Sequence, residues 1–471
     1  MIKSVSALKN IWKIPDLRRK VLYTLLLMGV YRVGAHVPTP FIDPGKLAEF
    51  IDNQRSAGGG LFAVVDLFSG FAFRNMSVFA LGIMPYISMS IILQLMTVVF
   101  PRLQKIQQEG ALGQRKINRW TRMGTIGLAA FQGFGLGTVL LSQGLSIYGS
   151  KYPGIFLFTT MMAMTTGTAF LMWLGERITE KGIGNGISLI IAFGILAQYP
   201  QDVFSLIYQM NKGGLEWIWL PIVAVLFVVS TVSIILIQEG TRRIPMQQAK
   251  RVVGRRVMSG GTNYLPLKIN TAGVIPVIFA SAILSFPSFI AGYVSAGNPQ
   301  GGFIGNLFSG NSPYNLYAFF QRWAGLESEG IFLILKSFNM HHVMFALFTG
   351  FFCYFYTAIS FNPDDVSNNL KKSGAFIPGK RPGKPTSEYI DFVLTRITTV
   401  GAIFLVAIAV LPLILETSYG MPYAAAAFVG GTGLIIVVGV FLDTLRQIES
   451  QLLMRHYEGF ALKRSSGSRW R

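Results

Sequence analysis

Apolar stretches recur along the whole length of this chain. A helix of about twenty such residues is long enough to cross the roughly 30 Å hydrocarbon core of a bilayer. We predict ten spans, at residues 20–38, 76–99, 121–143, 155–175, 184–208, 216–238, 271–294, 337–360, 391–415 and 422–442. Because backbone N–H and C=O groups find no water partner in lipid, each stretch must satisfy its own hydrogen bonds as a helix. The sequence therefore predicts an all-α integral membrane protein.

Positive charge is concentrated in every second gap between these stretches. The net charge is +20 although only 13% of the residues are charged, about half the charged share of an average soluble protein. Of the 41 Lys and Arg residues, 32 fall in the segments 1–20, 100–122, 176–182, 239–268, 361–390 and 443–471. Basic residues are retained on the cytoplasmic side, so we predict that both termini and the long basic loops lie there. Attraction to anionic lipid headgroups is an alternative explanation for charges next to a span.

Several segments do not read as spans. Residues 1–20 are basic and amphipathic, which predicts a helix on the membrane surface. Residues 61–74 are apolar but too short to cross, so we expect a re-entrant segment packed in protein. Alternation in the loop 239–268 predicts a β-ribbon. The loop 361–388 begins with a helix-start signal and ends in a Pro/Gly-rich tip, and we expect the tail 443–471 to be partly helical.

Proline and charged residues mark irregular places within the spans. Pro85 predicts a kink in the second span, and Pro276 and Pro287 predict a bend in the seventh. Arg32 lies near the outer end of the first span, where we expect its guanidinium to reach the interface.

Glycines mark two further features. The spacing of Gly133, Gly135 and Gly137 favours a close helix crossing. The glycines of residues 182–187 predict a hinge before the fifth span.

Signatures of catalysis or cofactor binding are absent from the sequence. It contains no HExxH motif and no paired carboxylates within the spans, which argues against metalloprotease, aspartyl protease and most proton-pump chemistry. The stretch GAFIPGKR, residues 374–381, is one residue short of a phosphate-binding loop, and Arg381 stands where Ser or Thr would bind magnesium. We therefore expect neither enzymatic activity nor a cofactor, so a partner or a gradient must supply energy.

Five long motifs resemble one known family. They are LFSGFAFRNMSVFALGIMPYISMSIILQL, TEKGIGNGISLI, LPLKINTAGVIPVIFA, FNPDDVSNNLKKSGAFIPGKRPG and FVGGTGLIIVVGVFLD. In this order they resemble the SecY family, the channel subunits of the bacterial protein-conducting translocon, from about residue 10 to residue 460. The resemblance implies ten helices in two pseudo-symmetric halves around a central channel. The halves would be residues 21–210 and 211–442, with a short re-entrant plug helix at 61–74.

The resemblance also implies roles for particular residues of this sequence. A ring of aliphatic side chains would form the constriction, at Ile83, Ile87, Ile187, Ile191, Ile278 and Ile436. The plug would include Leu61, Phe62, Val65, Asp66, Leu67, Phe68, Gly70 and Arg74. A lateral gate would be lined by Ser88, Gln94, Asn270 and Ser281, although interhelical hydrogen bonding without a gating role explains these residues equally well. Partner docking would use Arg255, Arg256 and Arg381, for which a solvated topology signal is the alternative.

The implied partners are the small membrane subunits SecE and SecG, the SecA ATPase, the ribosome, signal peptides, nascent chains and membrane lipid. The implied location is the bacterial inner membrane. A secondary transporter of a small solute is the competing hypothesis, because such proteins often have about ten to twelve spans and broken helices. It requires coupling residues near the midplane, and the sequence has few charged candidates there. An intramembrane enzyme is a third and weaker hypothesis.

Overall fold

The computed structural model describes residues 14–47, 69–147, 151–212, 217–248, 262–294, 340–419 and 429–466, together with Glu49, Asp66, Ala426 and the short strands 251–253 and 256–258. The first helices are α2 (Pro15–Gly34), α5 (Met84–Val99), α6 (Pro101–Gln108), α7 (Ala111–Ser142), α8 (Pro153–Lys181), α9 (Gly186–Leu196) and α10 (Tyr199–Asn211). They are followed by α11 (Trp219–Glu239), α12 (Ile275–Val294), α16 (Met340–Ser360), α17 (Pro363–Ser373), α18 (Lys384–Tyr419) and α20 (Gly431–Ser466). Five strands complete the set: β1 (Thr241–Gln248), β2 (Arg251–Val253), β3 (Arg256–Met258), β4 (Thr262–Lys268) and β5 (Ala375–Phe376).

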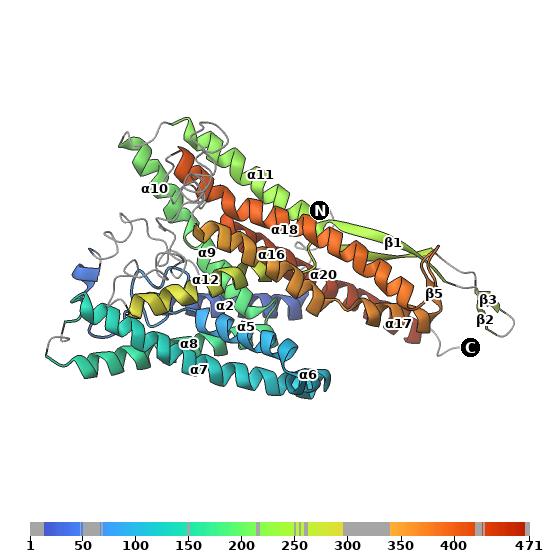
Figure 1. The fold of residues 1–471 in the computed structure, drawn as a ribbon, viewed down its shortest axis with the longest axis horizontal. Helices are drawn as coiled ribbons and strands as arrows, with labels where there is room; N and C mark the ends of the chain where they lie inside the picture. Colours follow the sequence, from blue (N-terminus) through green and yellow to red (C-terminus); the bar gives the residue numbers. More distant parts are fainter. Residues whose placement is uncertain are drawn as a thin grey trace, which may run out of the picture.

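The long helices lie side by side along the longest axis of the molecule, and the strands project from one end (Figure 1). Each of the ten predicted stretches overlaps at least one helix. Among the described residues, seven helical segments are long and apolar enough to cross a membrane, and the pair α5–α6 adds an eighth if it counts as one span. The remaining two stretches correspond to α2, which carries charged residues near both ends, and to α12, of which Ile275–Leu284 is a shorter apolar helix. The all-α membrane architecture is therefore confirmed.

The second span begins later than predicted and is not kinked at Pro85. Residues 69–83 form turns, and α5 starts at Met84, so that Pro85 occupies the first helical turn. Proline is tolerated there because the N–H it lacks would have no helical partner. The bend comes instead after the helix, where α6 turns by 102° from α5 at Pro101. Pro276 likewise lies in the first turn of α12, whereas Pro287 lies in the interior of that helix.

Small residues allow α7 and α8 to pack closely. A Cβ at Gly133 would lie 3.4 Å from the Met161 backbone, and one at Gly137 would lie 3.2 Å from Leu157. Both glycines therefore face α8, as their four-residue spacing predicts. Gly167 of α8 packs even more closely against the turns before α5, since an added Cβ would lie 2.0 Å from the Val78 carbonyl oxygen.

The two halves of the bundle meet at two seams. On one side α12 packs against α5 and α7, and on the other side α20 packs against α9. Within the halves, α7 packs on α8, and α16 packs on both α12 and α18. In Figure 1 the helices α7 and α8 lie at the bottom of the view, and α11 and α18 lie at the top. One large hydrophobic cluster, to which both halves contribute, fills the space between the seams.

The predicted glycine hinge joins α8 to α9. The Ile183 N–H donates to Thr24 Oγ1 of α2 at 3.1 Å, and the Gly184 N–H donates to Gln447 Oε1 of α20 at 3.0 Å. Gly184 has φ of +87°, a conformation that glycine adopts without strain. Two helices distant in sequence therefore fix the backbone of this hinge.

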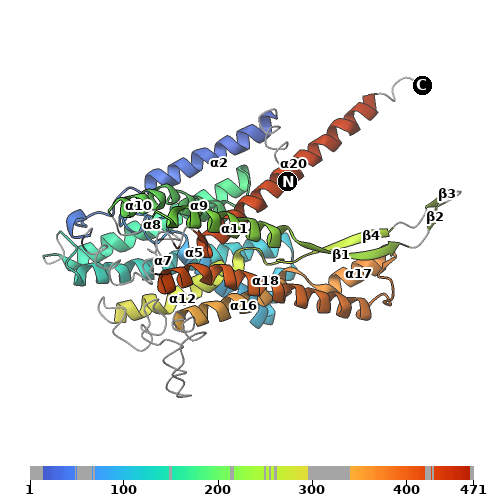
Figure 2. The same cartoon turned by 90° about the horizontal axis from the view of Figure 1, so that it is seen from above.

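Strands and a short helix form a unit beyond the bundle. The predicted β-ribbon is confirmed: β1 pairs antiparallel with β4 from Thr241↔Lys268 to Gln247↔Thr262, and β5 pairs with β1. The predicted helix start is confirmed at α17, where the Asn362 side chain accepts from the Asp364 N–H at 3.1 Å. Figure 2 shows the ribbon and the end of α20 projecting separately from the bundle.

Substituting Gly167 with Ala tests the close packing on α8. The new methyl group has no room beside the Val78 carbonyl, so we expect an overpacking cost of about 1–3 kcal/mol. The apparent melting temperature of the purified protein in detergent should fall. Gly127→Ala on α7 is the matched control, because nothing lies within 4 Å of its added Cβ. Equal melting temperatures for the two variants would contradict the packing described here.

Candidate functional site

The six isoleucines predicted to form a ring all lie in, or pack against, one large hydrophobic cluster of the bundle. Five of them are buried, with exposures of 0–6%, and belong to the cluster between the seams; they are Ile83, Ile87, Ile191, Ile278 and Ile436. Ile187 is partly exposed and packs against the same cluster. The six come from the N-terminal end of α5 and from α9, α12 and α20, the four helices that meet across the seams.

Local geometry orients two pairs of these side chains. Ile83 caps α5, and its carbonyl accepts from the Ile87 N–H at 3.0 Å, so the pair lies one turn apart on one helix face. Asn185 caps α9 and accepts from the N–H groups of Ile187 and Ser188. Ile187 packs against Gly175 of α8, where an added Cβ would lie 2.9 Å from its Cγ1.

Only part of the predicted plug falls within the described residues. Leu61, Phe62, Val65, Leu67 and Phe68 lie outside them. Asp66 is 5% exposed and forms an ion pair with Arg74. Arg32 donates from Nη1 to the Gly70 carbonyl at 3.2 Å, so its guanidinium also binds protein. The sequence could not reveal this contact, because the acceptor is a backbone group 38 residues away.

The four candidate gate residues lie on or next to the two helices of the first seam. Gln94 donates to Ser90 one turn earlier at 3.3 Å, and Ser281 donates to the Val277 carbonyl at 2.9 Å. Asn270 donates to the Gly273 carbonyl in the turn before α12 at 2.8 Å. Ser88 is buried in α5. The hydrogen bonds of Gln94, Asn270 and Ser281 described here are therefore all local to one segment.

The two long basic loops share a small hydrophobic core. Its buried members come from β1, β4, the turn after β5, and α18; they are Ile244, Leu267, Ile377 and Ile390. Ser387 donates to Asp364 Oδ1 at 2.6 Å, and Ser367 donates to the Gly383 carbonyl at 2.7 Å, which ties the Pro/Gly-rich turn to α17 and α18. Arg381 is exposed on that turn, and its carbonyl accepts from Thr386 Oγ1 at 2.8 Å.

The ribbon tip carries the other two docking candidates. Arg255 lies outside the described residues. Arg256 begins β3, paired with Val253 of β2.

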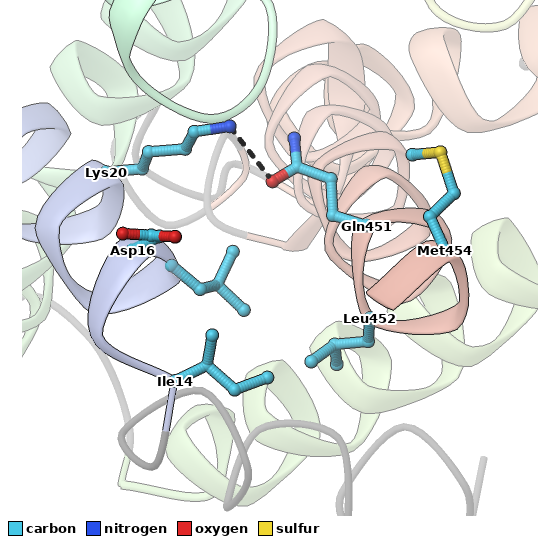
Figure 3. Close-up of a pocket in the computed structure, with 7 residues that line it drawn as sticks. Ile14, Asp16, Lys20, Gln451, Leu452 and Met454 are labelled. Atoms are coloured by element: carbon cyan, nitrogen blue, oxygen red, sulfur yellow. Dashed lines mark hydrogen bonds between the residues drawn. The ribbon is translucent and has the colours of Figure 1, made fainter. Parts of the chain in front are cut away.

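A groove lies between the first and the last long helix. Its volume is about 300 Å³, and Lys20 donates to Gln451 Oε1 across it at 3.4 Å (Figure 3). The lining residues are Ile14, Asp16, Leu17, Lys20, Gln451, Leu452 and Met454. Leu17 packs with Ile183 and Ile448 in a small apolar cluster beneath it. The groove lies at the outer surface of the bundle, apart from the six isoleucines.

Some residues that position the site were not predicted from the sequence. Tyr31 on α2 donates to the Ser69 carbonyl, and Thr24 and Gln447 hold the hinge before α9. A polar side chain inside an apolar stretch was the one available signal for Tyr31 and Thr24.

Within the described residues, no group of three or more His, Cys, Asp or Glu side chains could hold a metal ion.

Comparisons with known proteins agree with this architecture. A SecY family profile matches residues 77–445. The protein translocase subunit SecY of Thermus thermophilus is 42% identical over 459 residues, covering 96% of this chain and 97% of that protein. The Escherichia coli K12 subunit is 42% identical over 456 residues, covering 96% and 95%.

Solved structures share the fold at lower sequence identity. One protein-conducting channel has a TM-score of 0.59 at 16% identity, covering 92% of this chain and 91% of that one. Canine Sec61 in its ribosome–channel complex gives the same TM-score, identity and coverage.

The family profile and the two translocase relatives, together with the shared helical fold, define the class of protein-conducting membrane channels. Within that class, the chain belongs to the SecY family. This membership assigns it to protein translocation and not to the transport of small solutes. It also makes the chain a channel subunit and not an enzyme.

Proposed function

We propose that this chain moves unfolded secretory polypeptides across the bacterial inner membrane through a ring of six isoleucines. The observation that supports this most is that these side chains, from four helices of both halves, belong to or pack against one hydrophobic cluster. A narrow aliphatic constriction excludes water and ions by dewetting, and it can widen around an extended chain. The ring therefore serves as both seal and conduit.

The external seal is the plug, residues 61–74. Its support is the bond from Arg32 of α2 to the Gly70 carbonyl, which holds the C-terminal part of this segment against the bundle. The partly buried ion pair of Asp66 with Arg74 fixes the fold of the segment itself. A segment held inside the bundle agrees with a stretch that is apolar yet too short to span.

Lateral release occurs at the seam between α5 and α12, near Ser88, Gln94, Asn270 and Ser281. Transfer from the channel to lipid favours Leu and Ile and costs a charged residue about 2.5–3.5 kcal/mol at the membrane centre. Apolar segments therefore leave through this seam while charged ones continue across.

The unit of β1–β5 and α17 docks the SecA motor or the ribosome on the cytoplasmic side, where both termini also lie. Arg255, Arg256 and Arg381 supply guanidinium groups, which bind phosphate and carboxylate in bidentate geometry. Canine Sec61, which shares this fold, has been solved in a ribosome–channel complex.

The small subunits SecE and SecG accompany the chain in the membrane. If they are absent from the channel purified from native membranes, this part of the proposal is wrong.

A photo-crosslinking residue placed at Ile87 or Ile278 should react with an arrested secretory chain. Both side chains lie in the proposed ring, so a chain in transit must touch them. Ile92 is the matched control, because it lies on the same helix as Ile87 but is 40% exposed on the outer face. If the chain reaches the far side without crosslinks at either ring position, the conduit lies elsewhere.

Deleting residues 61–74 should raise ion leak through the reconstituted channel while translocation persists. The ring alone would then seal the membrane, without its external cover. Ion flux into proteoliposomes measures the leak, and uptake of a secretory precursor measures transport. An unchanged leak would remove the plug assignment.

Charge reversal at Arg381 should weaken docking. Arg381→Glu replaces attraction to an acidic partner by repulsion, and the loss of one exposed pair costs up to about fivefold in affinity. Binding of SecA, and of ribosomes, to the channel in proteoliposomes is the measurement, at two salt concentrations because exposed charges are screened. Arg119→Glu is the control, since Arg119 is equally exposed but lies on α7. Equal binding by both variants would contradict the assignment of Arg381.

A further inference from the structure

The backbone at Gly70 touches the backbone of α9 directly. A Cβ added to Gly70 would lie 2.9 Å from the Gly194 Cα, and one added to Gly194 would lie 2.7 Å from the Gly70 Cα. Neither position tolerates a side chain without movement of the other backbone. Gly70 also has φ of +65°, which disfavours other residues. Two glycines distant in sequence therefore create one contact without side chains.

Tyr31 fixes the same place from α2. Its hydroxyl donates to the Ser69 carbonyl at 3.0 Å, and it would lie 1.9 Å from a Cβ added to Gly70. The ring of Tyr31 is 1% exposed and stacks on Phe79 with centroids 6.3 Å apart, and Phe79 stacks in turn on Phe170 at 5.9 Å. This packing leaves the hydroxyl one position, aimed at the Ser69–Gly70 peptide.

The segment held there is bonded to itself. The Phe71 N–H donates to the Asp66 carbonyl at 2.7 Å, and the Arg74 N–H donates to Asp66 Oδ1 at 3.2 Å. The Ser69 hydroxyl donates to the Asp66 carbonyl at 3.0 Å and accepts from the Phe73 N–H at 3.2 Å. The turn from Ser69 to Arg74, with Asp66, is therefore one bonded unit whose position is set where it touches Tyr31 and Gly194.

We propose that Tyr31 and Gly194 form a seat that holds this turn, and through it the plug, in the sealing position. The inference rests on the proposed function of residues 61–74. Tyr31 is a positioning residue: it contacts the backbone of the turn and not the polypeptide in transit. Arg32 reinforces the seat through its bond to the Gly70 carbonyl. Because the seat holds main-chain groups, it is specific for the small residue at Gly70 and not for the side chains of the plug.

Tyr31→Phe removes the hydroxyl and keeps the stacked ring. Loss of one neutral buried hydrogen bond should raise the unseated fraction about fivefold. We expect a matching rise in ion leak into proteoliposomes, with precursor transport retained. Tyr23→Phe, on the same helix two turns earlier, is the matched control and should behave as the unmodified channel.

A second readout follows the turn itself. Ala72 is fully buried in the turn, so Ala72→Cys in a Cys353→Ala background reports its seating. Reaction with an impermeant maleimide should be about fivefold faster when Tyr31→Phe is added, and unchanged with Tyr23→Phe. Gly194→Ala, which places a methyl group against the Gly70 backbone, should speed the reaction as well.

The results separate the seat from the plug. If deletion of residues 61–74 raises the leak while Tyr31→Phe and Gly194→Ala change neither leak nor labelling, the seat is overturned and the plug stands. If labelling accelerates but neither the deletion nor Tyr31→Phe raises the leak, the plug assignment fails and the proposal falls with it. Parallel increases in leak and labelling support both.

Discussion

Contact between helices of opposite halves holds this bundle together. On one side α5 and α7 pack on α12, and on the other α9 packs on α20. The aliphatic cluster lies between these contacts and receives side chains from both halves. Its attraction is dispersive and non-directional, so the proposed seal needs no fixed bonding pattern that would resist rearrangement. The rest of the architecture serves to bring these five helices to the same place.

The two seams differ in what holds them. At the second seam and its hinge, main-chain donors bind Thr24 and Gln447, which are directional bonds between distant helices. At the first seam the bonds of Gln94 and Asn270 stay within one segment, and Thr97 donates to the Gln94 carbonyl in its own helix. Bonds inside one helix survive when two helices separate. Opening at α5 and α12 therefore costs apolar contact but leaves the bonds of Gln94 and Asn270 intact, whereas parting α9 from α20 would strand the Gly184 N–H that binds Gln447.

The sequence was sufficient for the parts of the fold that depend on local pattern. Long apolar stretches predicted the helices, alternation predicted the ribbon, and Asn362 predicted the start of α17, because each depends on residues close in the chain. The kink predicted at Pro85 was wrong, since hydropathy continues through residues 76–83 while the backbone there forms turns. Of the site, resemblance supplied the isoleucines, and packing brings them into one cluster. The contacts of Tyr31 and Arg32 with residues 69–70 were beyond prediction, because a backbone acceptor has no sequence signature.

The shared core of the two long loops has a mechanical consequence. Strand β1 continues from α11, β4 leads into α12, and the segment with α17 and β5 connects α16 to α18. Since Ile244, Leu267, Ile377 and Ile390 pack together, these four helices are joined at one end by a single rigid head. A force applied to that head is therefore transmitted to all four helices together and tends to rotate the second half as one body. The compliant joints are then the two seams between the halves, where α12 meets α5 and α7 and where α20 meets α9.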